Sequence, residues 1–385
     1  MTEDSFTEVS QESWFGRLGG AFKGILVGLI LLIVAFPLLF WNEGRSVKEY
    51  KTLKEGGGAV VSVASDTVDA ANTGKLLHLS GKANTEATLK DPVFGVSANA
   101  LKLKRVVEMY QWKETSQSET KKKLGGGTET VTTYTYSKTW SDKAIPSANF
   151  KESTKQHQNP GSLPYESREQ SADVVTLGAF TLSSSLVGQI NNFESLPVSN
   201  DTPLPATLKG KATVHETEFY IGADPASPQL GDVRIAFKVV KPTEASVIAK
   251  QVGNTFEPYR TKAGGAIELL ETGIHTADAM IQKEQESNIM LTWILRLAGF
   301  LLMLVGLSMI FKLLSVLADV LPILGDIVGA GTGIISFLSA AVLSLLTIAV
   351  AWIVYRPILG IILMVVAVGL TVAITGKLKS AKTAS

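Results

Sequence analysis

Four long apolar stretches interrupt an otherwise polar chain, at residues 24–41, 289–311, 332–354 and 357–375. Three of them contain no Asp, Glu, Lys or Arg, and the 289–311 stretch contains only Arg296. A helix needs about 20 mostly apolar residues to cross the roughly 30 Å hydrocarbon core of a bilayer. The pattern therefore predicts four transmembrane helices.

The second apolar stretch has an alternative register, 297–318, which contains Lys312 in place of Arg296. We favour 289–311, because an arginine near the end of a span can extend its charged head to the interface while its stem stays in lipid. An arginine inside a span can also belong to an ion pathway, but a position near the end favours the anchoring role.

Residues 42–288 have the composition of a soluble domain, and strand patterns dominate them. Residues 101–112 and 128–140 are rich in alternating and β-forming residues, and a charged, glycine-rich tip at 121–127 separates them. They predict a long β-hairpin. Further strands are expected at Ala59–Val63, Lys75–Leu79, Val174–Leu182, Ala212–Ile221, Val233–Val240 and Ser246–Val252. We expect one helix at Ala266–Leu270 and another from Thr276 through Glu286 that continues into the second span.

The expected fold is an α+β membrane protein, with four transmembrane helices and a large β-rich extracytoplasmic domain between helices 1 and 2. Residues 1–23 form a cytoplasmic N-terminal segment and residues 376–385 a cytoplasmic tail. Lys312, Asp319 and Asp326 recur every seven residues, so 312–328 is predicted as an interfacial helical segment that Pro322 interrupts. A helical hairpin that dips into the bilayer is the alternative for this segment.

Four crossings place both termini on one side of the membrane and residues 42–288 on the other. Lysine and arginine residues near the spans are almost balanced between the two sides. Because long domains are translocated largely regardless of such charge, we predict cytoplasmic termini. The acidic leading segment and the Trp41-Asn42-Glu43 sequence after the first span do not fit a cleaved signal peptide.

Aromatic and basic residues flank the apolar stretches, as is typical of the membrane–water interface. The predicted membrane-interface residues are Trp14, Trp41, Trp293, Arg296, Trp352, Tyr355 and Arg356.

Glycines recur every fourth residue at the beginning of two spans. Residues four apart share one helix face, so each series predicts a smooth groove in which another helix packs closely. The predicted helix-packing residues are Gly16, Gly20, Gly24, Gly28, Gly325, Gly329 and Gly333. The spacing does not decide whether the packing partner is in the same chain or in another copy.

The sequence contains no recognisable catalytic or metal-binding motif. There is no cysteine, and the four histidines are not at metal-ligand spacing. Glu268 and Glu271 stand three apart, which fits a solvated surface better than a catalytic pair. Lys+Arg total 36 against 35 Asp+Glu, so nucleic-acid binding is not expected. We predict no enzyme activity, no cofactor and no metal.

Short motifs along nearly the whole chain resemble the LUMA family, that is, transmembrane protein 43 and its bacterial relatives. These motifs are Asn42-Glu43-Gly44-Arg45, Asp91-Pro92 with Gly95-Val96, Val107–Trp112, Asn149-Phe150, Asn159-Pro160, Gly231-Asp232, Thr261-Lys262, Leu295-Arg296 and Tyr355-Arg356-Pro357. The resemblance implies four membrane spans, a large domain in the lumen or outside the cytoplasm, and no catalytic activity or cofactor.

The resemblance also implies a location and partners. Animal members lie in the inner nuclear membrane and endoplasmic reticulum, self-associate, bind emerin and lamins, and organise the nuclear envelope. A bacterial member would lie in the inner (cytoplasmic) membrane, where emerin and lamins do not exist. The absence of cysteine, the higher glycine content and an acidic N-terminal region distinguish this chain from the family pattern.

Three functional hypotheses follow. The first is a non-enzymatic membrane scaffold that self-associates through its spans and organises membrane protein complexes through its extracytoplasmic domain. The second is a channel or transporter subunit, whose pore would be lined by Arg296 with hydroxyls such as Ser336, Ser339, Ser344 and Thr347. Such hydroxyls more often bond within their own helix or to a neighbour. The third, a hydrolase or sugar-binding domain, would need a pocket with converging carboxylates or histidines.

Overall fold

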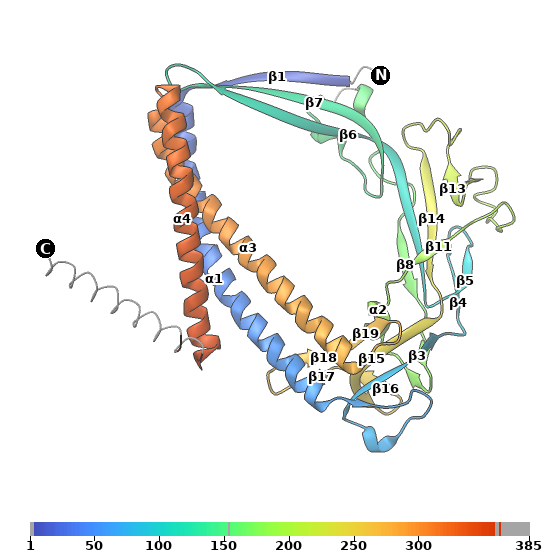
Figure 1. Cartoon of the computed structure of the whole chain (residues 1–385). Helices are drawn as coiled ribbons and strands as arrows, with labels where there is room; N and C mark the ends of the chain where they lie inside the picture. The colour runs from blue at the N-terminus through green and yellow to red at the C-terminus, as the bar shows by residue number, and fades with distance from the viewer. Residues whose placement is uncertain (1–3, 153–154, 359–361, 363–385) are drawn as a thin grey trace.

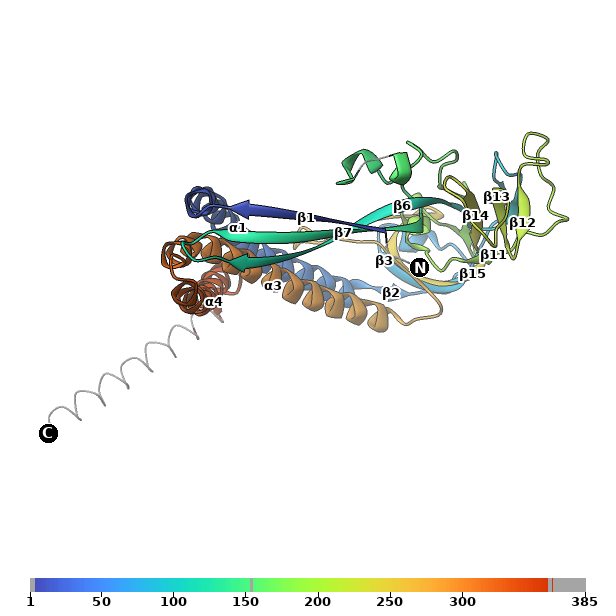
Figure 2. The ribbon, with the colours of Figure 1, turned by 90° about the horizontal axis from the view of Figure 1, so that it is seen from above.

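The computed structural model describes residues 4–152, 155–358 and 362. Helices, a long β-hairpin and a β-rich domain form the three sides of a flat triangle (Figure 1). Seen from above, the helices, the hairpin and the domain form a thin, flat arrangement (Figure 2). The fold is α+β, with a large β-rich domain, as the sequence predicts.

Three of the described helices are long and apolar enough to cross a membrane: α1 (Trp14–Ala59), α3 (Ala277–Ala318) and α4 (Pro322–Tyr355). Side-chain oxygens of Ser13 and Thr276 cap the first turns of α1 and α3 by accepting backbone N–H hydrogen bonds. The helix predicted from Thr276 into the second span is confirmed as one continuous α3. The predicted fourth span, 357–375, lies almost wholly outside the described residues, as does the tail at 376–385.

The prediction of a separate interfacial helix at 312–328 is wrong. Helix α3 continues to Ala318, and α4 begins at Pro322, so only three residues separate them. Proline is well accommodated in the first helical turn, where its missing N–H would have no intrahelical acceptor. Pro322 therefore begins a helix, and the charged residues around it lie at a helix–helix turn.

The strands form two large antiparallel-dominated sheets and two small ribbons. The eight-stranded sheet has the order β1-β7-β6-β14-β13-β12, with β11 on β14 and β8 on β6. The seven-stranded sheet has the order β10-β9-β3-β15-β16, with β19 on β15 and β2 on β3. The strands are β1 Asp4–Glu12, β2 Val61–Ser62, β3 Leu76–Asn84, β4 Thr88–Lys90, β5 Ser97–Asn99, β6 Lys102–Lys122, β7 Thr128–Ser141, β8 Arg168–Ser171, β9 Thr176–Leu177, β10 Phe180–Thr181, β11 Glu194–Leu196, β12 Thr213–His215, β13 Glu218–Ile221, β14 Val233–Val240, β15 Thr243–Val252, β16 Thr255–Glu257, β17 Tyr259–Arg260, β18 Ala266–Ile267 and β19 Leu269–Thr272.

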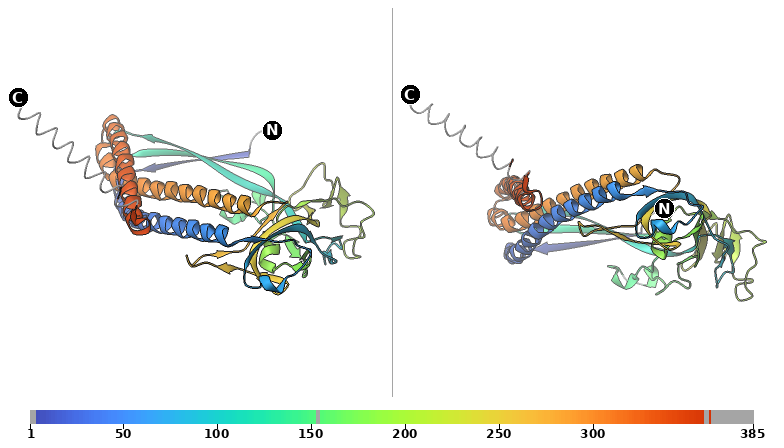
Figure 3. Two further views of the ribbon diagram at one scale, coloured as in Figure 1. Left: turned by 60° about the horizontal axis from the view of Figure 1, so that its bottom comes forward. Right: turned by 90° about the horizontal axis from the view of Figure 1, so that it is seen from below.

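Each large sheet has its own apolar core. One core gathers around Leu79, Leu177 and Val247, and the short helix α2 (Ser184–Gln189) covers it. The other gathers around Phe94, Phe219 and Phe237. A third cluster joins Leu53 of α1 and Met280 of α3 to Ile248 of β15. The C-terminal end of α1 and the N-terminal end of α3 are therefore packed into the domain, and Figure 3 shows the two helices side by side.

Two local predictions in this region are wrong. Residues 266–270 form strands β18 and β19 where a helix was expected, because Ile267 packs against Gly56 of α1 and pairs with Tyr259. Residue 59 ends α1, and only Val61–Ser62 form the strand expected at 59–63. In both places, contacts with distant elements outweigh the local pattern.

The long β-hairpin is confirmed. Strands β6 and β7 pair continuously from Met109↔Ser141 to Lys122↔Thr128. The hairpin extends out of the domain and forms the upper side of the triangle (Figure 1).

The N-terminal segment adds a third strand to this hairpin. Strand β1 pairs with β7 over nine residues, from Asp4↔Tyr136 to Glu12↔Thr128. Residues 4–12 and the large domain thus share one sheet. The prediction that places 1–23 and 42–288 on opposite sides of a membrane is therefore wrong for residues 4–12, since a bilayer cannot separate the strands of one ladder. The charge patterns near the spans carry no information about this pairing.

Candidate functional site at the two ends of the helix bundle

A buried ion pair joins all three long helices at the end of the bundle nearest the domain. Glu43 of α1 has no solvent exposure and accepts two hydrogen bonds from Arg296 of α3, at 2.6 and 2.9 Å. The indole Nε1 of Trp352 in α4 donates to the same carboxylate at 2.7 Å. Both oxygens of a buried carboxylate are therefore satisfied, which is the condition under which such a charge is tolerated.

A second polar layer extends this arrangement along α1 and α3. Arg45 donates to Asn288 and Thr292 at 3.0 Å each, and Asn42 Nδ2 donates to the carbonyl of Thr292 at 3.0 Å. Asn288 Nδ2 donates to the carbonyl of Ser46. We refer to the set Asn42, Glu43, Arg45, Asn288, Thr292, Arg296 and Trp352 as the polar junction.

Gly44 lets α4 approach α1 at this level. A Cβ added at residue 44 would lie 2.6 Å from the ring of Tyr355, which is closer than real Cβ contacts. The Asn42-Glu43-Gly44-Arg45 motif thus supplies an anion, a cation and a gap on one helical turn.

Arg296 is held by an ion pair, and its head does not extend freely into solvent. Its side chain is 13% exposed and its guanidinium is held by Glu43. It also lies over the rings of Trp293 and Trp352, at 4.7 and 5.8 Å from their centroids. The partner of Arg296 lies 253 residues away on α1, so the residues of its own span do not reveal the pair.

A second charged cluster closes the opposite end of the bundle. Asp319, between α3 and α4, has a buried side chain that pairs with Arg17 of α1 and with Lys122 at the end of β6, the latter at 2.6 Å. Lys122 also contacts Asp326 at 2.8 Å. Trp14 Nε1 donates to the carbonyl of Val316 at 2.8 Å. We refer to Arg17, Lys122, Asp319 and Asp326 as the tip clamp.

The electrostatics of the tip clamp favour its charged form. Burial raises the pKa of Asp319, but the hydrogen bonds from Lys122 and Arg17 outweigh burial and leave the pKa below its ordinary value. Burial likewise lowers the pKa of Lys122, and the hydrogen bonds to Asp319 and Asp326 raise it above the ordinary value. Salt-bridge formation at this end is therefore retained throughout the neutral range.

Sequence reasoning did not identify the tip clamp. The sequence pattern predicts Lys122 in a charged, glycine-rich hairpin tip and Asp319 in an interfacial helix. The available signal was that Arg17 and Asp319 border apolar stretches, where an unpaired charge is costly.

The glycines predicted to pack helices have different neighbours in the structure. Gly28 meets Gly306 of α3 so closely that an added Cβ would lie 2.5 Å from the Gly306 carbonyl oxygen. An added Cβ at Gly24, Gly325 or Gly329 would contact Met309, Asp319 and Ser315, respectively. Gly16 and Gly20 lie near Glu12, and around Gly333 the described residues leave open space. Close α1–α3 packing within one chain thus uses Gly24 and Gly28.

The predicted interfacial aromatics divide into two groups. Trp41 and Trp293 are 55% and 63% exposed. Trp14, Trp352 and Tyr355 are partly buried and take part in the contacts described above, and Arg356 lies over Trp352 at 5.7 Å from the ring centroid.

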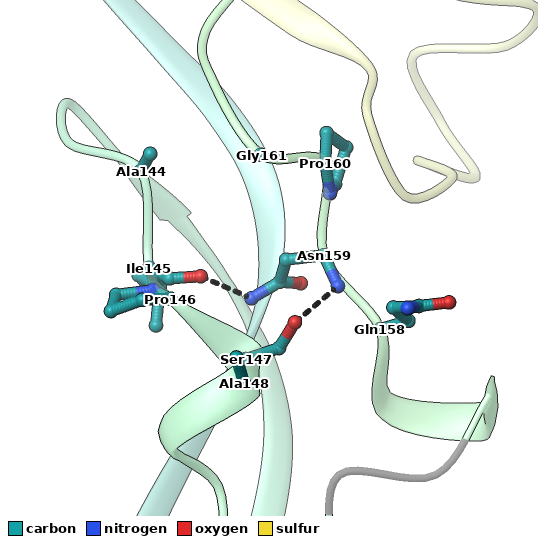
Figure 4. Close-up of a pocket in the computed structure, with 9 residues that line it drawn as sticks. All are labelled: Ala144, Ile145, Pro146, Ser147, Ala148, Gln158, Asn159, Pro160 and Gly161. Carbon is teal, nitrogen blue, oxygen red and sulfur yellow. Dashed lines mark hydrogen bonds between the residues drawn. The ribbon is translucent and has the colours of Figure 1, made fainter.

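A surface pocket of about 460 Å³ lies between residues 144–148 and 158–161 (Figure 4). Asn159 lines this pocket, but its side-chain amide is already hydrogen-bonded to backbone groups of the protein. Asn159 Oδ1 accepts from the Trp112 N–H at 2.7 Å, and Nδ2 donates to the carbonyls of Trp112 and Ile145. Ser147 Oγ accepts from the Asn159 N–H. Asn159 therefore holds this loop against β6, and the pocket presents no catalytic arrangement.

Within residues 4–152 and 155–358, no group of three or more potential ligands could hold a metal ion. His78 contacts Ser62 and the carbonyl of His275, and His157 stacks on Tyr136 and pairs with Asp4. His215 lies at the end of β12. Glu268 accepts from Ser183, whereas Glu271 pairs with Lys283, so these two carboxylates do not act together.

Comparison with known proteins identifies one family. The family described as Transmembrane protein 43 matches residues 109–357. Transmembrane protein 43 of Mus musculus is 35% identical over 364 residues, which cover 91% of this chain and 89% of the mouse protein. The Homo sapiens protein is 35% identical over 367 residues, covering 92% and 90%. The Drosophila melanogaster homolog is 31% identical over 348 residues, covering 88% and 90%. No solved structure matches the chain.

Proposed function

Since the chain belongs to the transmembrane protein 43 family, we propose that it is a non-enzymatic membrane scaffold that holds a β-rich domain rigidly against a bilayer. The scaffold self-associates through its apolar helices and organises other membrane proteins through the domain. The single observation that carries this proposal is the attachment of the domain to both ends of the helix bundle.

The two attachments lie far apart along α1. The polar junction at Glu43 and the tip clamp at Arg17 are separated by 26 residues of helix, or about 40 Å. The domain reaches the first through α1 and α3, and the second through β6 and β7. A domain on a single tether would reorient freely, whereas two attachments fix its orientation, as a scaffold requires.

The composition of the hairpin restricts how the bundle lies in the membrane. Between Trp112 and Lys122, β6 is largely exposed and consists of Lys, Glu, Thr, Ser and Gln after its first residue. Its partners β7 and β1 are also mostly polar. Charged, exposed strands with an open edge do not occur in hydrocarbon. The hairpin and both attachments of the domain therefore lie on one aqueous side, and the exposed apolar faces of the helices lie in lipid.

Disulfide trapping in the native membrane tests this arrangement, because the chain has no cysteine of its own. Thr7→Cys and Thr133→Cys are directly paired across β1 and β7 and should crosslink readily under mild oxidation. The control pair, Thr7→Cys with Thr128→Cys, is out of register by five residues, roughly 17 Å, and should not crosslink. A membrane-impermeant thiol reagent that reaches Thr7→Cys and Thr133→Cys from opposite sides of the membrane would refute the arrangement.

The outward face of α4 supports self-association. Ile334 and Leu345 are 62% and 66% exposed, and Gly333 leaves open space beside them. Close contact between membrane helices requires small residues at the interface. We expect Ile334→Cys or Leu345→Cys to form intermolecular disulfides in the native membrane.

The buried Ala340, on the inner face of the same helix, provides a matched control. Ala340→Cys should remain uncrosslinked. A chain that stays monomeric in detergent at all concentrations, with no crosslink at either outward position, would contradict self-association.

The alternative function, a channel or transporter subunit, needs free polar groups along a pore. Arg296 is paired with Glu43, and Ser336, Ser344 and Thr347 donate to carbonyls of α4 itself. These contacts favour the scaffold. Flux of ions through liposomes that contain the purified chain would reverse this preference.

A further inference from the structure

A cavity of about 720 Å³ opens where α1, α3 and α4 leave the apolar bundle. One part of its lining is apolar, with Val47, Ile289, Pro357 and Ile358. The rest is polar or cationic. This combination differs from the 460 Å³ pocket of Figure 4, whose lining carries no charged residue.

The charged residues of this lining are all cations. Lys51 and Lys54 come from α1, and Arg356 follows α4. No Asp or Glu lines the cavity, and within the described part of the chain none of the three cations is in a salt bridge. Three adjacent cations repel one another, so a bound anion stabilises the site.

The cavity lies at the boundary between lipid and water. On one side the helices expose apolar side chains, such as Trp293 at 63% and Ile289 at 58%. On the other side α1 continues as the charged segment that ends at Ala59. Tyr50 and Tyr355, residues typical of headgroup depth, also line the cavity.

The polar junction fixes the floor of the cavity. Asn288 is 7% exposed, accepts from Arg45 and donates to the carbonyl of Ser46, and both Asn288 and Ser46 line the cavity. A floor held in this way does not need to be ordered when a ligand binds, which favours binding.

We propose that this cavity binds the headgroup of an anionic phospholipid. The phosphate is held by Lys51, Lys54 and Arg356, since arginine and lysine are the side chains that bind phosphate. The acyl chains lie against Val47, Ile289 and Ile358 and continue into the bilayer. The apolar wall selects a lipid over a soluble phosphate. Binding at this site goes beyond the scaffold role and does not depend on self-association.

Native mass spectrometry of the purified full-length chain tests the proposal. The protein in neutral detergent is given equimolar phosphatidylglycerol and phosphatidylcholine, and the bound lipids are counted. The wild type should retain phosphatidylglycerol at least fivefold over phosphatidylcholine. Each of Lys51→Gln, Lys54→Gln and Arg356→Gln should weaken phosphatidylglycerol binding about fivefold, the value expected for one cation near a lipid phosphate. The triple variant should bind both lipids equally.

Two matched variants distinguish lipid binding in this cavity from nonspecific attraction between the protein's positive charge and the lipid. Lys48, one turn before Lys51 on α1, lies beside Gly264 and outside the cavity lining, so Lys48→Gln should bind like the wild type. Lys51→Arg with Lys54→Arg keeps the charge and should also bind like the wild type. If the triple variant does not fold by circular dichroism, Lys54→Gln alone gives the same comparison.

Three results would overturn the proposal. The first is wild-type selectivity in the triple variant, or in Lys54→Gln where only that variant folds. The second is an equal loss in Lys48→Gln. The third is displacement of phosphatidylglycerol by an equal concentration of glycerol phosphate, which would show a soluble-phosphate site.

Discussion

At the scale of single residues, Glu43 is the most constrained side chain of the bundle. It is fully buried, and among the described residues Arg296 is the one cation that pairs with it. Removing one member of a buried ion pair leaves the other charge without compensation, which costs more than the pair itself contributes. The polar junction therefore fixes the register of the three helices. The hydrogen bonds of Glu43 to Arg296 and Trp352 form only when α1, α3 and α4 are aligned as they are here.

We expect Glu43→Gln to lower the free energy of unfolding by about 3–5 kcal/mol, because Arg296 loses its counter-charge. The measurement is thermal unfolding in detergent, followed by circular dichroism. Glu43→Leu combined with Arg296→Met should recover a large part of this loss. If the double variant is as unstable as Glu43→Gln, the uncompensated charge is not the cause.

Glu284 on α3 gives a prediction about pH. Burial raises its pKa, and the nearby carboxylates of Glu271 and Glu49 add to the effect. A raised folded-state pKa means that the ionised side chain opposes folding at neutral pH, and that this penalty is relieved as the pH falls. Glu284→Gln should therefore raise the melting temperature at pH 7.

The stabilisation by Glu284→Gln should disappear near pH 4, where the carboxyl of the unfolded chain is also protonated. Glu286→Gln, an exposed position on the same helix, is the control and should change little at either pH. Equal shifts at both positions would indicate a general charge effect.

At the scale of elements, the α1–α3 contact depends on two glycines that face each other. An added Cβ at Gly28 would lie 2.5 Å from the Gly306 carbonyl oxygen and 3.1 Å from Cβ of Met309. Backbone atoms cannot move away independently, so any side chain at residue 28 separates the helices. The contact extends from there to Leu39, which packs against Gly299.

Gly28→Ala should destabilise the bundle by about 1–3 kcal/mol, the typical cost of overpacking, even though alanine favours helices. Gly331→Ala on α4 is the matched control, because the described residues leave open space around it. That control should be neutral or slightly stabilising. The comparison uses denaturant unfolding in the same detergent, and equal effects of the two substitutions would contradict close α1–α3 packing.

At the scale of the whole molecule, the triangle of Figure 1 is closed by the tip clamp. The clamp joins residues that lie 302 positions apart, Arg17 and Asp319, and brings the hairpin tip to the same point. The clamp adds to two other links between the hairpin and the helices. The Gly125 N–H donates to the carbonyl of Val320, and strand β1, which pairs with β7, leads directly into α1.

Asp319→Asn should loosen the hairpin tip, so that trypsin cleaves after Lys121–Lys123 about tenfold faster, as expected when a buried charge pair is broken. Asp326→Asn, whose side chain is 71% exposed, should have little effect. Because the folded-state pKa of Asp319 is below its ordinary value, the clamp should persist from neutral pH to about pH 4 and be lost below that. Slow hydrogen exchange at residues 119–129 over this range would confirm the persistence.

The sequence by itself determined the local elements. The apolar stretches mark the long helices α1, α3 and α4, and alternation along 101–112 and 128–140 marks the hairpin. These helices and strands follow from the residue spacing within each element. They can therefore be predicted without knowing which other elements they contact. The family resemblance likewise came from short local motifs, and the comparisons bear it out.

Only the tertiary structure decided what these elements contact. Glu43 meets Arg296 across 253 residues, β1 joins β7 across more than a hundred, and Lys122 reaches Asp319 across 197. Pairing at such separations depends on which surfaces the folded chain brings together, and the spacing within either partner does not encode it. For this reason the sidedness inferred from the spans was wrong for the N-terminal strand, and the cationic cavity beside the junction was not foreseen.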